Sequence, residues 1–156
     1  MLDDDRLNAF SIGGGRIYVS RGTVTACRSE AELAAVIAHE MAHDLVGHLC
    51  ARSSSRSEGR RIGPVRQRLD PVQEREADAA SLPLLVAAGY DPHAALAVVR
   101  RVEQTDPDDP ERVGALAAHL EGTPTGGRGD SPAFRALTSP GSVARRRGSR
   151  RSARRP

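Results

Sequence analysis

The segment HEMAHDLVGH, residues 39–48, contains two histidines four positions apart, His39 and His43, with Glu40 directly after the first. On a helix, residues four apart lie on the same face, with Cβ atoms about 5–6 Å apart. Two imidazoles in that arrangement can bind one zinc ion, and the adjacent glutamate can act as general base toward the water that the zinc activates. This spacing predicts zinc-dependent hydrolysis of peptide bonds. A buried, hydrogen-bonded cluster without a metal is the alternative interpretation.

A catalytic zinc ion usually has three protein ligands and an open position for water, so the chain must supply a third ligand. The segment EREAD, residues 74–78, offers one, because Glu74 and Asp78 are four positions apart and share a helix face. We expect Glu74 to complete the shell of one zinc ion per chain. We expect Asp78 to accept the remaining N–H of a ligand imidazole and so fix its orientation. Glu76 points away from that face and is expected to be a solvated surface acid.

The first helix that must carry these residues is marked by its capping pattern. Ser29 followed by Glu32 predicts a capping box at the start of a helix over residues 31–49. This helix is apolar almost all round, which predicts burial inside a domain. The exception is a polar stripe that ends at His48, for which we expect a supporting role rather than direct chemistry.

Turn and capping residues mark the remaining elements. Residues 8–22 are typical of two short strands around a turn of three glycines. Asp-Pro pairs that begin at positions 70, 91 and 109 predict three helix starts, because Asp caps free backbone amides and Pro fits the first helical position. The first of these helices contains EREAD.

Composition divides the chain at about residue 121. Residues 122–156 contain nine Arg and one Asp among many Gly, Pro and Ser, which predicts a disordered basic tail without core residues. Residues 1–121 are the expected folded domain, and 156 residues suffice for one domain rather than two. No stretch approaches the roughly 18 apolar residues of a transmembrane helix, and the acidic N-terminus does not resemble a signal peptide. Composition leaves the compartment undetermined.

Several motifs in this order resemble the zinc metalloproteases that include HtpX and the CAAX prenyl endopeptidases: NAFSIGGGRIYVSRG, HEMAHDLVGH, EREAD, AAGYDP and PERV. The resemblance covers about residues 7–120. It implies an α+β fold, namely a mostly helical, zincin-like (gluzincin) catalytic domain with a short N-terminal β-hairpin. It also implies endopeptidase activity on protein or peptide substrates. Zinc would be bound by His39, His43 and Glu74, with Glu40 as catalytic base.

The resemblance raises further expectations. The strand near Arg16–Ser20 should lie along the active-site cleft, where a substrate chain could add as an extra strand. The chain begins almost at the first motif, which suggests a truncated member, and analogy with the family suggests the cell envelope. Asp106 stands where many members have a histidine. Asp106 and Arg112, which belongs to the PERV motif, are candidate modulators of the site.

Two competing functions follow from the same residues. A catalytically weak or inactive relative could keep the fold and act as a binding or chaperone-like module. The presence of Glu40 argues against this, because a purely structural zinc site has no use for a general base. The arginine-rich tail could instead bind nucleic acid or an anionic membrane. It accompanies no recognisable nucleic-acid-binding fold, so no specific nucleic-acid partner is expected.

Overall fold

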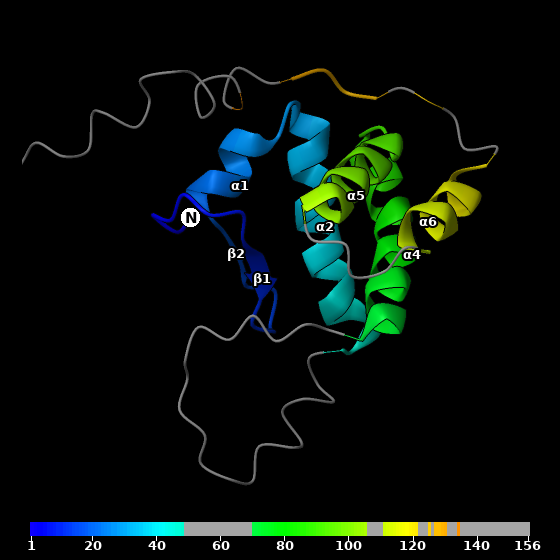
Figure 1. The fold of residues 1–156 in the computed structure, drawn as a ribbon, viewed down its shortest axis with the longest axis horizontal. Helices are drawn as coiled ribbons and strands as arrows, with labels where there is room; N and C mark the ends of the chain where they lie inside the picture. The colour runs from blue at the N-terminus through cyan, green and yellow to red at the C-terminus, as the bar shows by residue number, and fades with distance from the viewer. Residues whose placement is uncertain (49–69, 106–110, 122–124, 126, 131–133, 135–156) are drawn as a thin grey trace, which may run out of the picture.

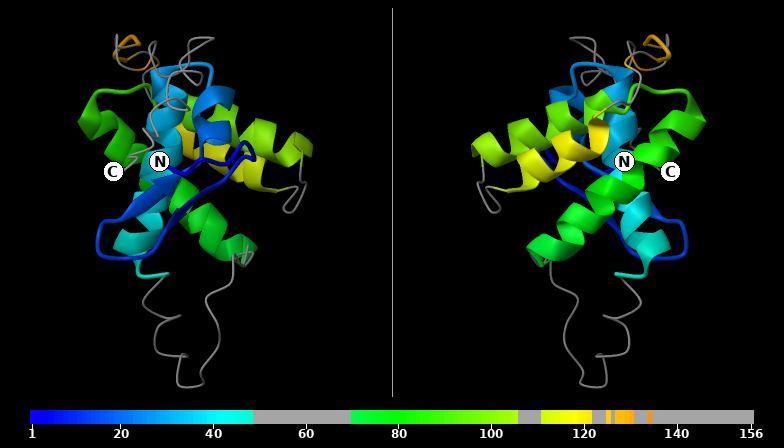
Figure 2. Two further views of the ribbon diagram at one scale, coloured as in Figure 1. Left: turned by 90° about the vertical axis from the view of Figure 1, so that its left-hand side faces the viewer. Right: turned by 90° about the vertical axis from the view of Figure 1, so that its right-hand side faces the viewer.

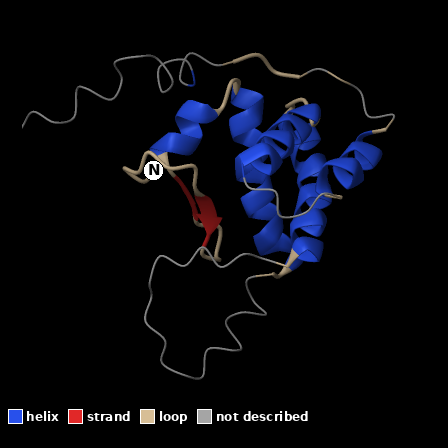
Figure 3. Cartoon of the chain, viewed as in Figure 1, coloured by secondary structure: helices blue, strands red, loops and turns tan. Residues whose placement is uncertain are grey.

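The computed structural model describes residues 1–48, 70–105, 111–121, 125, 127–130 and 134. These residues form, in chain order, β1 (Ala9–Ser11), β2 (Ile17–Val19), α1 (Arg21–Ala26), α2 (Glu30–Val46), α4 (Pro71–Ala88), α5 (His93–Thr105) and α6 (Arg112–Leu120). Helices dominate, and the two strands form one short hairpin (Figure 1 and Figure 3). The prediction of a mostly helical fold with an N-terminal β-hairpin is confirmed.

The hairpin is built around the predicted glycine turn. β1 and β2 pair antiparallel with Phe10 opposite Tyr18, and the two rings stack with centroids 5.4 Å apart. The glycines at 13–15 all have positive φ, which residues with a side chain adopt only at a cost. Directly after β2, the side chain of Ser20 accepts a hydrogen bond from Thr23 N and caps the short helix α1. The sequence analysis did not predict this helix.

Local sequence defines both ends of α2. Ser29 Oγ accepts a hydrogen bond from Glu32 N at 3.2 Å, which is the predicted N-cap. In the usual capping box, the glutamate side chain accepts a hydrogen bond from the backbone N–H of the N-cap residue. Here Glu32 Oε2 accepts instead from the N–H of the residue before the N-cap, Arg28, at 2.8 Å. Gly47, with a φ of 86°, ends the helix in the left-handed conformation that favours glycine, so α2 ends at Val46 and not at the expected residue 49.

Burial of α2 is limited to part of its circumference. Ala35, Ala38 and Ala42 are buried, whereas Met41 and Leu45 are 42% and 70% exposed. The burial expected from its apolar pattern is therefore only partial. Among the described residues, α4, α5 and the hairpin cover parts of the helix and leave the side with Met41 and Leu45 in solvent. Within the described ranges, none of the helices is long and apolar enough to cross a membrane.

The helix that carries EREAD, α4, begins as predicted. Asp70 Oδ1 accepts a hydrogen bond from Val72 N at 2.9 Å, and Pro71 occupies the first helical position. Gly89 ends the helix with a φ of 78°. The side chain of Asp91 also bonds the backbone N–H of the first residue of α5. The third Asp-Pro pair, at 109, lies outside the described residues.

The core lies among α2, α4, α5 and α6. α4 packs against α2, and the side views of Figure 2 show that the two helices cross. α6 packs on both α4 and α5. Ala42 on α2 and Ala77 on α4 are fully buried, and such small side chains let two helix backbones approach closely. The main hydrophobic cluster consists of Ala35, Ala38, Leu82, Leu85, Ala95, Val99, Leu116 and Leu120. The packing of α2 on α4 brings the HExxH segment against EREAD.

Some residues of the expected tail pack against these helices. Phe134 is only 5% exposed. Asp130 Oδ1 accepts a hydrogen bond from Glu30 N at the start of α2, at 2.6 Å. The guanidinium of Arg128 lies 5.3 Å from the centre of the Tyr90 ring. The expectation that residues 122–156 offer no core residue is therefore wrong at Phe134, although most of that range lies outside the described residues.

Candidate metal centre

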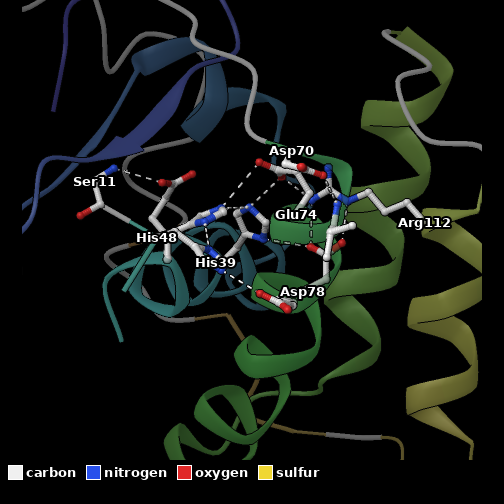
Figure 4. Close-up of polar contacts among 11 residues, drawn as sticks. Ser11, His39, His48, Asp70, Glu74, Asp78 and Arg112 are labelled. Atoms are coloured by element: carbon white, nitrogen blue, oxygen red, sulfur yellow. Dashed lines mark hydrogen bonds and ion pairs between the residues drawn. The ribbon is translucent and has the colours of Figure 1, made fainter. Parts of the chain in front are cut away.

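Three potential metal ligands converge where α2 packs on α4 (Figure 4). His39 and His43 stand one turn apart on α2, with their Nε2 atoms 3.0 Å apart. Glu74, in the first turn of α4, presents Oε2 to His39 Nε2 at 3.3 Å and Oε1 to His43 Nε2 at 3.7 Å. One donor atom from each residue lies within 4.8 Å of the other two. The structure thus brings together the three residues that the sequence analysis selected.

The spacing of these donors fits a zinc ion. Ligands bound at about 2.0–2.1 Å in a tetrahedral shell lie roughly 3.3 Å from one another. In the structure the two Nε2 atoms lie 3.0 Å apart, and they lie 3.3 and 3.7 Å from the two different oxygens of the Glu74 carboxylate, all close to that value. Two imidazoles and a carboxylate are also a common ligand set of catalytic zinc ions, and three ligands leave a fourth position for water. The residues present could therefore hold such an ion.

Asp78 on α4 and Arg112 on α6 support this cluster. Asp78 Oδ1 lies 2.9 Å from His39 Nδ1, although that buried nitrogen lies off the line of a well-formed hydrogen bond. Arg112 donates from Nε and Nη2 to the two carboxylate oxygens of Asp78, at 2.5 and 2.9 Å. Its Nη2 also lies 3.1 Å from Glu74 Oε2. One guanidinium therefore orients both acidic residues of EREAD that face α2.

Glu40 connects the cluster to the hairpin. Its Oε2 accepts a hydrogen bond from the backbone N–H of Ser11 in β1, at 3.0 Å. One turn later, Asp44 Oδ2 accepts from Gly15 N in the glycine turn, at 3.1 Å. Two carboxylates of the polar stripe on α2 thus anchor the hairpin through its backbone. It is β1, rather than the strand near Arg16–Ser20, that contacts the proposed base.

The pKa values of the two histidines shift in opposite directions. Burial lowers the pKa of His39, but the nearby carboxylates of Asp78 and Glu74 outweigh burial and raise it to about 9. Burial and the charge on His39 lower the pKa of His43 to about 4. Without a metal, His39 is therefore protonated at neutral pH and His43 is neutral. Two carboxylates thus favour a positive charge at this point, which is the electrostatic requirement of a metal site.

The acidic residues also have distinct pKa shifts. Burial raises the pKa of Glu40, partly opposed by the charge on His39, and so brings a candidate general base closer to neutral pH. Burial acts in the same direction on Glu74 and Asp78. There, hydrogen bonds and charges from His39 and Arg112 more than offset it and keep the pKa of both groups below the ordinary value. Both therefore stay ionised at neutral pH.

His48 lies next to the cluster and is buried, with 5% of its surface exposed. Its Nδ1 lies 2.9 Å from His43 Nδ1, and its Nε2 lies 3.0 Å from Glu76 Oε2. The side chain of Glu76 is 55% exposed, as expected of a surface acid, but its contact with a buried imidazole was not expected. Asp106, the other candidate modulator, lies outside the described residues.

Three sets of contacts around these residues were not predicted from the sequence. The anchoring of the hairpin by Glu40 and Asp44, the bonds from Arg112 and the contact between Glu76 and His48 join segments distant in the chain. The only signal in the sequence was the spacing of ionisable groups on an otherwise apolar helix. Ionisable groups on a buried helix need charged or hydrogen-bonding partners, but their spacing does not show which residues those partners are.

Comparison with known proteins gives matches to parts of this chain. Residues 1–60, which include HExxH and stop before EREAD, match the family model of peptidase family M48. The chain is 42% identical over 48 residues to the mitochondrial metalloendopeptidase OMA1 of Schizosaccharomyces pombe; the match covers 31% of this chain and 14% of that protein. It is 45% identical over 53 residues to a Vibrio cholerae protein assigned as a beta-barrel assembly-enhancing protease, which covers 34% of this chain and 11% of that protein.

The residues that match the family model include the hairpin and the HExxH helix. The chain spans less than a sixth of the length of either relative. Both relatives are named as proteases, and both matches are confined to about a third of this chain. Over its first 60 residues, the chain is similar to peptidase family M48.

Proposed function

We propose that this protein is a zinc-dependent metalloendopeptidase, with one zinc ion bound by His39, His43 and Glu74 and with Glu40 as general base. The observation that carries the proposal is the convergence of two imidazole nitrogens and one carboxylate at distances that suit zinc. The match of residues 1–60 to a peptidase family supports it.

Each residue has a role that follows from its contacts. A zinc ion at this position would supply a Lewis acid that polarises the scissile carbonyl and lowers the pKa of water. Glu40 lies beside the ligands, and burial raises its pKa, so its carboxylate can take a proton from water and return it to the leaving amine. Asp78 and Arg112 hold His39 and Glu74 in place.

The test uses purified full-length protein. Zinc content is measured by elemental analysis, and casein hydrolysis is assayed with and without a chelator. We expect about one zinc per chain and hydrolysis that the chelator abolishes and added zinc restores. Absence of zinc from protein refolded with excess zinc would contradict the metal site. Stoichiometric zinc without hydrolysis would contradict the peptidase and favour a non-enzymatic binding module.

Glu40→Gln separates the base from the metal site. The amide oxygen can still accept the hydrogen bond from Ser11 N, so the hairpin contact is retained, but an amide cannot take a proton. Hydrolysis should fall by about 10²–10⁴-fold, with zinc content unchanged. The matched control is Glu121→Gln at an exposed position after α6, which should change neither. Full activity in Glu40→Gln would remove Glu40 from the mechanism.

A further inference from the structure

The turn after α2 directs His48 back toward the metal cluster. The N–H groups of Gly47 and His48 donate to the carbonyls of Asp44 and His43, respectively, which is the hydrogen-bond pattern of a Schellman motif. Gly47 provides the left-handed residue that this turn requires. The turn places His48 next to His43 and buries it. A buried imidazole needs hydrogen-bond partners within the protein, because water does not reach its nitrogens.

Hydrogen bonding then determines which ring nitrogens carry protons. An ionised carboxylate only accepts hydrogen bonds, so Glu76 Oε2 at 3.0 Å requires a proton on His48 Nε2. In the neutral form of His48, which has one N–H, Nδ1 is then an acceptor. The partner of that acceptor, at 2.9 Å, is His43 Nδ1, which must therefore donate. His43 Nε2 is then left with its lone pair, and this is the atom that faces His39 and Glu74.

This arrangement parallels the support of the other histidine. His39 Nδ1 lies 2.9 Å from the carboxylate of Asp78. A carboxylate behind a ligand imidazole selects the tautomer that presents the second nitrogen to the metal. For His43, the corresponding carboxylate is that of Glu76, which acts indirectly, through the ring of His48.

A second metal ion between His43 and His48 does not explain these contacts equally well. Such an ion would need a third ligand, and His48 turns its other nitrogen to Glu76 on the opposite side of the ring. Within the described part of the chain, the group that can hold a metal consists of His39, His43 and Glu74.

We propose that Glu76 and His48 are positioning residues that hold His43 in its Nδ1–H tautomer and so present its Nε2 lone pair to the metal. The inference rests on the proposed metal site. It assigns to Glu76, half exposed on α4, a role in metal affinity that acts entirely through His48.

The direct test is ¹⁵N NMR of the histidine side chains in metal-free full-length protein at neutral pH. The chemical shifts of ring nitrogens separate N–H from lone-pair nitrogens. We expect His43 as the Nδ1–H tautomer and His48 as the Nε2–H tautomer. Glu76→Ala should abolish the preference of His48 for Nε2–H. A proton on His48 Nδ1 in the unmodified protein, alone or together with Nε2–H, would overturn the proposal.

Zinc affinity provides a second readout. Glu76→Ala should raise the Kd for zinc by about 10-fold, and His48→Leu, which removes the acceptor, by about 10–100-fold. His48→Gln should recover part of the loss, because its amide oxygen can accept from His43 Nδ1–H. Adding Glu76→Ala to His48→Leu should cause no further loss, since Glu76 acts through His48. Glu121→Ala is the matched exposed control. Fully additive losses, or equal losses in His48→Leu and His48→Gln, would contradict the relay.

These measurements separate the two proposals. If the protein binds no zinc, the metal site fails, and the tautomers of the metal-free chain still test the hydrogen-bonded relay. If zinc binds while the tautomers are reversed, the relay alone fails.

Discussion

Arg112 binds Asp78 through two hydrogen bonds, at 2.5 and 2.9 Å, although the residues are 34 positions apart in the chain. The same guanidinium lies 3.1 Å from Glu74 Oε2. α6 thereby orients the two carboxylates of α4 that face His39 and His43, without contributing a metal ligand of its own.

Replacement of Arg112 by lysine should weaken zinc binding. A lysine ammonium keeps the charge but lacks the planar, forked donors that engage both oxygens of Asp78 and also reach Glu74. We expect the Kd for zinc, measured by competition with a chromophoric chelator, to rise by about 10–100-fold. Arg100→Lys, at an exposed position on α5, is the control. Wild-type affinity in Arg112→Lys would show that the bidentate contact is dispensable.

Glu74→Gln should lower zinc occupancy after dialysis to well below one per chain. The substitution preserves the shape of the side chain but removes the negative charge beside His39 and His43. Elemental analysis of the dialysed protein provides the measurement, with Glu121→Gln as control. Equal zinc content in both variants would mean that Glu74 is not the third ligand.

Removal of the metal should destabilise the fold. Because the ligands come from two helices, the unfolded chain does not hold them together, and zinc stabilises the folded state by mass action. At free zinc of about 100 times the Kd, the gain in unfolding free energy is about 2.7 kcal/mol. Thermal unfolding with zinc and with chelator should differ by several degrees. The same chelator should leave the midpoint unchanged in a His39→Ala, His43→Ala double variant.

The ion pair between Glu32 and Arg101 should make stability depend on pH. Arg101 donates to both oxygens of the Glu32 carboxylate, each at 2.9 Å. Burial raises the pKa of Glu32, but Arg101 and the backbone N–H of Arg28 outweigh it and lower the pKa below the ordinary 4.5. The folded state therefore binds this proton more weakly than the unfolded state. The contribution is complete above the ordinary pKa and is lost as pH falls below it.

Urea unfolding of Glu32→Gln tests this contribution. At neutral pH we expect a loss of about 1–3 kcal/mol in the free energy of unfolding, because Arg101 loses a charged partner. The difference from the unmodified protein should shrink as pH falls below 4.5. A difference that stays constant over that range would rule out the ionised pair as its source.

Phe134→Ala should destabilise the protein, because this side chain is buried, with 5% of its surface exposed. Truncation of a buried phenylalanine usually costs about 3–5 kcal/mol. Val86→Ala, at a residue 55% exposed, is the apolar control and should change stability by at most about 0.5 kcal/mol. A thermal midpoint unchanged by Phe134→Ala would show that the segment around it does not contribute to folding.

The sequence by itself determined the local elements and the residue types of the site. Ser29 and Asp70 cap α2 and α4 through bonds to backbone amides two or three residues away, so a short stretch of sequence contains both partners. The glycine turn and the left-handed Gly47 and Gly89 depend likewise on single residues. His39 and His43 share a face because of the period of the helix, whatever else surrounds it.

Only the tertiary structure decided which partners these residues meet. The burial of α2 depends on how many elements pack around it, and the apolar pattern of the helix does not predict how many do. The side of α4 that faces α2, the approach of Arg112 from α6 and the burial of Phe134 depend on packing between segments far apart in the chain. Glu76 shows the physical reason most clearly. From its position in the helix it is a surface acid, and it meets His48 only because the turn at Gly47 directs that ring across to α4.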